Sequence, residues 1–137
     1  MSIVIGVIFS FSSFSQNIKE DKELLRLDSI AFQALETNSN LTTERANDLL
    51  NASLKRPPSL YRVNAYIILG IVNKEKGYYV TSLNHYLKAL NAAEDIKDKG
   101  RVSSCLNNIG TVYQQQGNYQ KAKEYFQLKN NSGAAES

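Results

Sequence analysis

The stretch that decides the fold runs from Leu106 to Phe126 and reads LNNIGTVYQQQGNYQKAKEYF. In its first half, apolar and small residues recur three, four and seven positions apart, which places them on one face of a helix. The same spacing returns in the second half at Tyr119 and Ala122. Gly117-Asn118 lies between the two patterns and supplies residues that tolerate a left-handed turn. The stretch therefore predicts two helices joined by a tight turn.

Small and large residues are arranged where these two helices would meet. Gly110 and Ala122 are small, and two antiparallel helices approach closely only where a side chain is nearly absent. Tyr113 and Phe126 then fill the space beside them. We therefore expect the two helices to pack tightly against each other.

The pattern recurs earlier in the chain. Gly70 stands 40 positions before Gly110. The other corresponding residues are Ile67, Ile68, Leu69, Gly77, Tyr78, Tyr79, Ser82, Tyr86 and Ala89. Asn73 replaces a tyrosine and Ser82 replaces an alanine, and we expect these two departures to loosen the earlier pair.

The spacing Leu-x-x-Ile-Gly-x-x-Tyr, followed by Gly-x-Tyr-x-x-Ala-x-x-x-Phe, resembles the tetratricopeptide repeat, a helix-turn-helix unit. The resemblance implies an all-α fold, a right-handed α-solenoid of about three antiparallel helix pairs. The period of 40 residues exceeds the usual length of about 34. It resembles the longer-period variants found in the repeat regions of bacterial exported or signalling proteins, with the extra residues at 95–100.

We expect one helical domain over residues 19–129, made of a degenerate repeat at 19–56 and clear repeats at 59–98 and 101–129. A helix is expected over Lys19–Glu36, and Thr42 or Thr43 is expected to cap the next one. Pro57-Pro58 should stop that helix, and Ser59 should cap the one that follows. Gly100 should break the chain before the last pair, and residues 130–137 should be disordered.

Residues 1–15 show a different sequence pattern from the rest of the chain. Ile3 to Phe14 contains no charged side chain, and small residues follow at Ser13 and Ser15, so residues 1–15 are expected to be a signal peptide cleaved before Gln16. No basic residue precedes the apolar run, which leaves open that the segment is an apolar helix packed on the domain. The run is shorter than the roughly 20 residues of a membrane span. We therefore expect no span, and an exported protein if the signal works or a cytoplasmic one if it does not.

Composition and motifs argue against a catalytic or metal-binding function. The chain has 137 residues, and its net charge of +3 comes from 16 basic residues interleaved with 13 acidic ones, so we expect no nucleic-acid partner. Cys105 is the only cysteine and His85 the only histidine, so neither a disulfide nor a catalytic triad can be assembled. Phosphate-loop, dinucleotide and zinc motifs are absent. We therefore predict no enzyme, no cofactor and no metal site.

The resemblance implies that the first helix of each pair lines a concave groove, where an extended peptide or a helix of a partner protein lies. The groove candidates are Asn64, Ile67, Ile71, Lys74, Ser104, Asn107, Asn108, Thr111, Gln114 and Gln115. Ile67 and Ile71 stand where a carboxylate-binding cluster of the family would need lysine and asparagine, which excludes recognition of a partner's terminal carboxylate. The predicted function is a protein-interaction scaffold. The alternative is the sensory region of a larger signalling protein, such as a histidine kinase or a transcriptional regulator.

We expect the last helix to leave apolar side chains uncovered. Repeat arrays normally close with a helix whose outer face is polar. Here Tyr125, Phe126 and Leu128 lie near the end of the chain with no following helix to cover them. We therefore predict that this end face binds a partner, associates with another copy, or is covered by a continuation of the protein.

Overall fold

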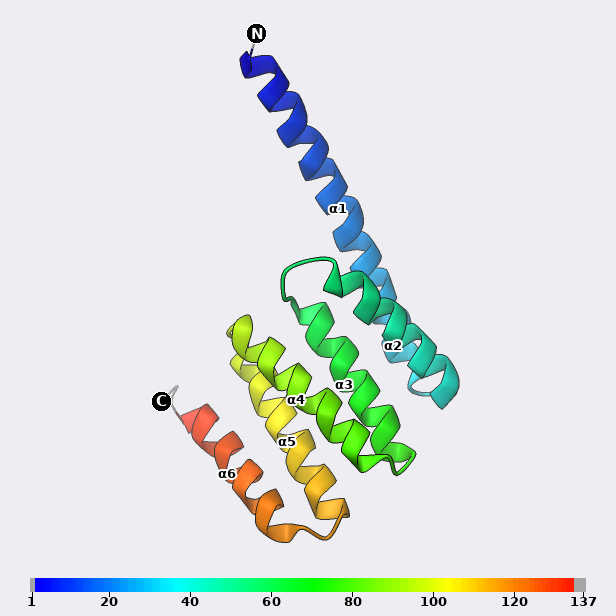
Figure 1. Cartoon of the computed structure of the whole chain (residues 1–137), viewed down its shortest axis with the longest axis vertical. Coiled ribbons are helices and arrows are strands. Elements are labelled where there is room, and N and C mark those ends of the chain that lie inside the picture. Colours follow the sequence, from blue (N-terminus) through cyan, green and yellow to red (C-terminus); the bar gives the residue numbers. More distant parts are fainter. Residues whose placement is uncertain (1, 135–137) are drawn as a thin grey trace.

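The computed structural model describes the backbone of residues 2–134 and the side chains of residues 12–133 (Figure 1). Over this range the chain forms six helices and no strand. They are α1 (Ser2–Ala34), α2 (Ser39–Leu54), α3 (Leu60–Glu75), α4 (Tyr79–Asp95), α5 (Lys99–Gln115) and α6 (Tyr119–Ala134). The prediction of an all-α helical repeat is confirmed.

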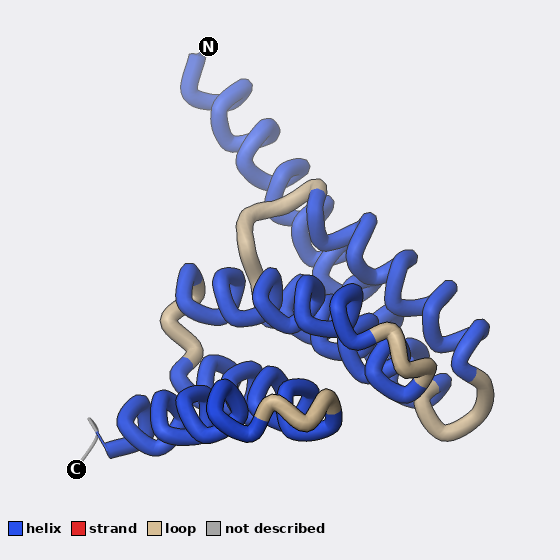
Figure 2. The backbone as a smooth tube through the Cα atoms, turned by 60° about the horizontal axis from the view of Figure 1, so that its bottom comes forward, coloured by secondary structure: helices blue, strands red, loops and turns tan. Residues whose placement is uncertain are grey.

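The helices form three pairs that stack one on the next, as Figure 2 shows from a second direction. The first helices of the pairs approach one another, because α1 contacts α3 and α3 contacts α5. Among the described residues, the second helices α2, α4 and α6 make no contact with one another. Neighbouring elements lie closer on the concave side of a curved stack, so α1, α3 and α5 form its inner layer.

Two apolar clusters hold the stack together, and each joins three successive helices. The first contains Leu24 and Leu27 of α1, Leu49 of α2 and Ile68 of α3. The second joins α3, α4 and α5 and includes Val63, Tyr86, Cys105 and Ile109. Because each cluster bridges two pairs, every pair depends on its neighbour for burial.

The turns after α3, α4 and α5 share one hydrogen-bond pattern. A left-handed residue ends each helix, at Gly77 (φ 77°), Lys97 (φ 55°) and Gly117 (φ 74°). The next amide donates to a carbonyl five residues back, at 2.8 Å, 3.0 Å and 2.9 Å respectively. Our prediction that Gly100 breaks the chain was wrong: Lys97 takes the left-handed position, Asp98 caps α5, and Gly100 lies in its first turn.

The N-terminus of α2 is capped by a residue that the sequence analysis passed over. Asn38 Oδ1 accepts from the amides of Asn40 and Leu41. Thr42, one of the expected caps, lies inside the helix, where its buried Oγ1 donates to the carbonyl of Ala34 at 2.7 Å and so ties α2 to α1. Thr43 also lies within the helix. Asn38 takes the cap because it precedes the first turn in extended backbone.

The two departures from the repeat pattern are satisfied by the backbone. Ser82 Oγ donates to the carbonyl of Gly70 across the α3–α4 contact at 2.7 Å. Asn73 Nδ2 donates to the carbonyl of Leu69 within α3 at 2.7 Å. Buried polar groups are tolerated when they are hydrogen-bonded in this way.

Both ends of the fold differ from expectation. The apolar N-terminal segment and the helix expected from Lys19 are one continuous helix, α1, whose first half projects beyond the stack (Figure 1). No helix of the described chain is both long enough and apolar enough to cross a membrane. At the other end, α6 runs on to Ala134 where disorder was expected from residue 130, and residues 135–137 lie outside the described range.

Candidate functional site

The expected groove residues fall into two groups on the inner layer. Asn64 and Ile67 are buried: Asn64 Nδ2 donates to Asp28, and Ile67 belongs to the second apolar cluster. The half-buried members are Ile71, Lys74, Asn107, Asn108 and Thr111, and the exposed ones are Ser104, Gln114 and Gln115. The accessible part of the predicted site therefore lies mostly on α5. Partner binding by these residues stays a prediction.

A polar cluster links the three helices of the inner layer. Asn64 Nδ2 of α3 donates to both carboxylate oxygens of Asp28 on α1, at 2.9 Å and 3.1 Å. Burial raises the pKa of the Asp28 carboxyl, while the hydrogen bond from Asn64 and the charge of Arg101 on α5 oppose the rise. Arg101 itself lies 3.4 Å from Asp98 between Nε and Oδ2. The inner layer thus holds a partly desolvated carboxylate bonded to the Asn64 amide, an arrangement suited to hydrogen bonding and charge recognition.

The sequence analysis missed Asp28, although a signal for it exists. Asp28 stands 36 residues before Asn64, the same offset that separates Ala46 from Ser82. Following that offset through the whole first pair would have placed Asp28 on the groove side. Arg101 carries no such signal, because its proximity to Asp28 depends on how α5 packs beside α3.

The polar side chains of α5 are positioned by contacts within the last pair. Thr111 Oγ1 donates to the carbonyl of Asn107 at 2.9 Å. Lys129 Nζ of α6 donates to Asn107 Oδ1 at 3.2 Å. A rigid helix therefore presents amide and hydroxyl groups that can donate to or accept from a peptide backbone.

The predicted end face is only partly uncovered. Tyr125 stacks on Tyr113 of α5 with ring centroids 5.5 Å apart, and the ring of Phe126 lies against Gly110. Both side chains are half-buried, whereas Leu128 is 51% exposed. A shallow hollow of about 360 Å³ lies beside them, between Gln114 and Lys123 among others. Tyr125 and Phe126 are therefore covered mainly by α5, and Leu128 is the most exposed apolar residue of the three.

The two residues with reactive side chains have structural environments. Cys105 is buried, and burial raises the pKa of its thiol to about 12, so the nucleophilic thiolate is scarce. His85 lies tilted against Tyr66 with ring centroids 6.3 Å apart, and burial lowers its pKa. Over the described residues, no group of three or more His, Cys, Asp or Glu side chains is placed to hold a metal ion. Cys105 and His85 therefore fit structural roles in the helix packing.

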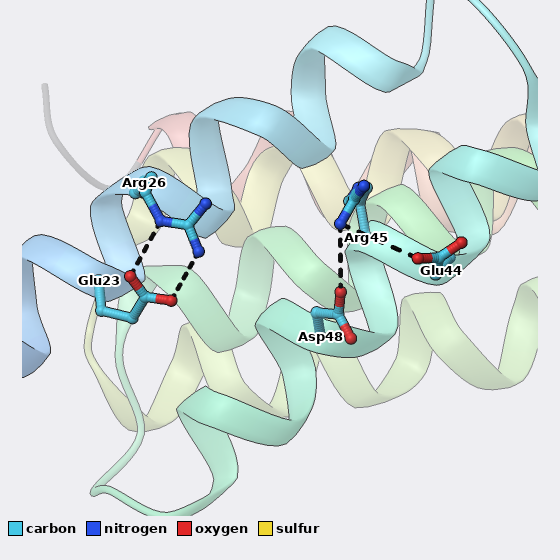
Figure 3. A network of polar contacts seen from close by, with 5 residues as sticks. All are labelled: Glu23, Arg26, Glu44, Arg45 and Asp48. Carbon is cyan, nitrogen blue, oxygen red and sulfur yellow. Dashed lines mark hydrogen bonds and ion pairs between the residues drawn. The ribbon is translucent and has the colours of Figure 1, made fainter.

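The outer faces of α1 and α2 carry exposed ion pairs (Figure 3). Arg26 pairs with Glu23 at 2.7 Å, and Arg45 lies 3.8 Å from Asp48 and 3.9 Å from Glu44. Exposed pairs of this kind contribute little to stability. They mark a solvated surface.

A comparison with models of protein families identifies the family of the repeats. Residues 61–128 match the model of the tetratricopeptide repeat. This part of the chain consists of tetratricopeptide repeats. Such repeats generally mediate protein–protein interactions and typically act as non-enzymatic scaffolds. A comparison with curated proteins found no match to the chain. The pair α1–α2 precedes the matched residues, and its assignment as a degenerate repeat stays a prediction.

Proposed function

We propose that the protein is a non-enzymatic scaffold that binds an extended peptide or a helix of a partner protein along the inner layer. The observation that carries the proposal is the row of half-buried polar side chains on α5, where Asn107 and Thr111 are fixed by hydrogen bonds. At the equivalent places 40 residues earlier, α3 has Ile67 and Ile71, which pack in or against the apolar cluster that includes α5. The change from isoleucine on α3 to asparagine and threonine on α5 supports a role for α5 in binding polar groups of a partner.

Amide side chains suit recognition of a peptide backbone. Asparagine and glutamine both donate and accept, so they can pair with backbone N–H and C=O groups of any sequence. The carboxylate of Asp28 adds a place where a basic side chain would be favoured over an acidic one. The proposed ligand is therefore a polar peptide segment, with selectivity from charge near α1 and affinity from the amides of α5.

Site-specific photocrosslinking in the source cells tests this proposal. A photoreactive amino acid at Gln114, on the inner layer, is expected to capture a discrete partner. The matched control places it at Val80, which is 79% exposed on α4. Capture from Gln114 should be lost when Asn108→Asp is added, since a carboxylate cannot donate a hydrogen bond. Equal capture from both positions, or capture that the Asn108 substitution leaves unchanged, would exclude the inner layer as the binding surface.

Export is part of the same proposal. The uncharged run from Ile3 to Phe14 supports a signal peptide that is removed before Gln16. Mass spectrometry of the protein recovered from its source should then find an N-terminus at Gln16. An intact Met1 on protein recovered from the cytoplasm would exclude export.

The second candidate is a sensory region of a larger signalling protein, such as a histidine kinase or a transcriptional regulator. The exposed Tyr119 and Leu128 on α6 favour it, because a following domain could cover them. The sequence of the genome on both sides of the reading frame tests this candidate. A continuous frame into a kinase or DNA-binding domain would support it, and stop codons on both sides would exclude it.

A further inference from the structure

The helix α1 has two apolar faces, and the stack uses only one of them. Leu24, Leu27, Ala31 and Ala34 are buried against α2 and α3. A second set of large apolar side chains on the same helix is exposed. These are Phe14 at 63%, Ile18 at 41%, Leu25 at 58% and Phe32 at 43%. A helix with a second apolar face usually has something to cover it.

The exposed residues, named here the α1 stripe, follow a heptad spacing. Ile18, Leu25 and Phe32 are seven residues apart, and Phe14 stands four before Ile18. In the sequence, the same seven-residue spacing continues at Phe11 and Val4. Residues at this period stay on one side of a helix that winds around a second helix, so the stripe supplies one of the two seam positions of a coiled-coil heptad.

The corresponding face of α3, in the next pair, is covered by neighbouring helices. Leu25 and Phe32 stand 36 residues before Tyr61 and Ile68 of α3. On α3, Ile68 belongs to the first apolar cluster and Tyr61 packs against it, so both are covered by the preceding pair. The α1 stripe thus occupies places that a helix covers elsewhere in the same molecule.

The opposite end of the stack is formed by α5 and α6, and it has polar residues at two positions that are apolar in the preceding pair. The face that α3 and α4 turn towards α5 includes Ile67 and Leu83, both in or against the second apolar cluster. Their equivalents 40 residues later are Asn107 and Lys123. These replacements make the end of the stack at α5 and α6 polar at two positions that are apolar in the preceding pair, although Leu128 of α6 stays exposed.

We propose that the α1 stripe docks against α1 of a second copy of this chain, antiparallel, in a two-fold symmetric dimer. The stripe runs from the stack onto the projecting first half of α1 (Figure 1), so the helix that covers it must extend beyond the stack as well. A second α1 of 33 residues has that length and the same heptad spacing. A two-fold pair buries the same surface on both copies.

Charges beside the stripe set the orientation. Asp21 and Asp28 stand at the second seam position of the heptads, four residues before Leu25 and Phe32 respectively. A parallel, in-register pair would place each carboxylate against its own copy, which is unfavourable. An antiparallel pair avoids this. Asp21 is also neutralised within its own chain by Arg56, with Oδ1 and Nη1 2.6 Å apart.

The ion pair between Glu23 and Arg26 does not obstruct the dimer. At about 100° of rotation per residue, Glu23 lies on the opposite side of the helix from the stripe. Figure 3 shows its carboxylate bonded to Arg26 of the same helix. The dimer leaves α3 and α5 uncovered, and Asp28 is the one residue that its seam shares with the proposed peptide site. Removal of residues 1–15 would take away Phe14 and most of the projecting part of α1 and would leave Ile18, Leu25 and Phe32, so the dimer proposed here is that of the uncleaved chain.

Sedimentation equilibrium of the full chain over a concentration series tests the proposal. The expected limiting mass is twice that of the 15.3 kDa monomer. Leu25→Glu or Phe32→Glu should weaken dimerisation roughly a hundredfold, because each buries a charge at the seam. Val80→Glu and Leu128→Glu are matched controls at exposed apolar positions outside the stripe, and they should leave the mass unchanged. Circular dichroism checks that every variant is folded.

Three results would overturn the proposal. They are a wild-type chain that stays monomeric at every concentration, a dimer that Leu25→Glu and Phe32→Glu leave intact, and a dimer lost in Leu128→Glu, which would place association on α6. Orientation has its own readout, from spin labels on Ser12→Cys. Cys105 is buried and does not compete for the label. Antiparallel helices hold the two labels far apart at opposite ends of the dimer, and a short label-to-label distance would exclude this orientation.

Discussion

Gly70 lies directly beneath the ring of Tyr86: a Cβ at Gly70 would come within 2.6 Å of the ring carbon Cε1. The last pair repeats this contact, because a Cβ at Gly110 would lie 2.6 Å from Cε1 of Phe126. In both pairs the missing side chain lets an aromatic ring of the second helix rest on the backbone of the first. The tight helix packing expected from Gly110 is therefore present, and it occurs twice.

Adding a methyl group at these glycines should destabilise the fold. Gly70→Ala is expected to cost about 2–3 kcal/mol and Gly110→Ala about 1–2 kcal/mol, since overpacking a close contact forces rings and backbone to shift. The first is larger because Tyr86 is fully buried, whereas Phe126 is half-buried and can move. Urea unfolding measures both. The matched control is Gly133→Ala, where a Cβ meets nothing within 4 Å. Equal midpoint shifts at all three sites would contradict the packing argument.

The turn at Lys97 holds a residue other than glycine in the left-handed conformation, which the sequence pattern did not predict. A lysine with φ of 55° occupies the position that glycine takes in the other two turns. Lys97→Gly should therefore stabilise the protein by about 0.5–1 kcal/mol. This is the steric free-energy cost of a left-handed lysine, reduced by the larger entropy that glycine loses on folding. Gly117→Ala is the reverse change at the equivalent turn and should destabilise by about 1 kcal/mol. Thermal unfolding of both variants checks the pair, and a loss of stability in Lys97→Gly would count against it.

The sequence predicted the helix pairs well because their signals are local. Helical spacing, Gly77 and Gly117 place α3 to α6 within a few residues. The errors arose at helix ends, where more than one residue can take the turn or the cap. Lys97 takes the left-handed position before α5, where Gly100 was expected to break the chain, and Asn38 caps α2, where threonines were expected.

The candidate site was less predictable, because the burial of its residues depends on contacts between helices. The resemblance placed Asn64 and Ile67 on a groove, but α1 and α5 pack close enough to bury them. The sequence predicted Tyr125 and Phe126 to be uncovered, yet both are half-buried, with Tyr125 stacked on Tyr113 and Phe126 against Gly110 of α5. Burial by a neighbouring helix depends on stacking distances that spacing alone does not contain.

The half-buried carboxylate of Asp28 should make stability depend on pH. Burial raises its pKa in the folded state, so its favourable contribution is present below the unfolded pKa of about 3.9 and is lost as pH rises through the folded pKa. Asp28→Asn removes the charge and keeps an oxygen that can accept from Asn64. The variant should therefore gain stability relative to the wild type between pH 3 and pH 7, measured by urea midpoints. A difference between Asp28→Asn and the wild type that does not change with pH would show that Asp28 is well solvated.

The last helix should be the least protected part of the stack. Among the described helices, α6 contacts α5 alone, whereas α4 contacts both α3 and α5. Since each pair is stabilised by its neighbours, amides from Ala122 to Lys129 should exchange with deuterium faster than those in the middle of α4. Tyr125→Ala should speed exchange in α6 further, because it removes the stack on Tyr113, and a designed helix added after residue 134 should slow it. Leu25→Glu should leave α6 unchanged, since the proposed dimer does not cover that end. Equal protection of α4 and α6 in a monomeric sample would mean that α5 alone holds α6 as firmly as two neighbours hold α4.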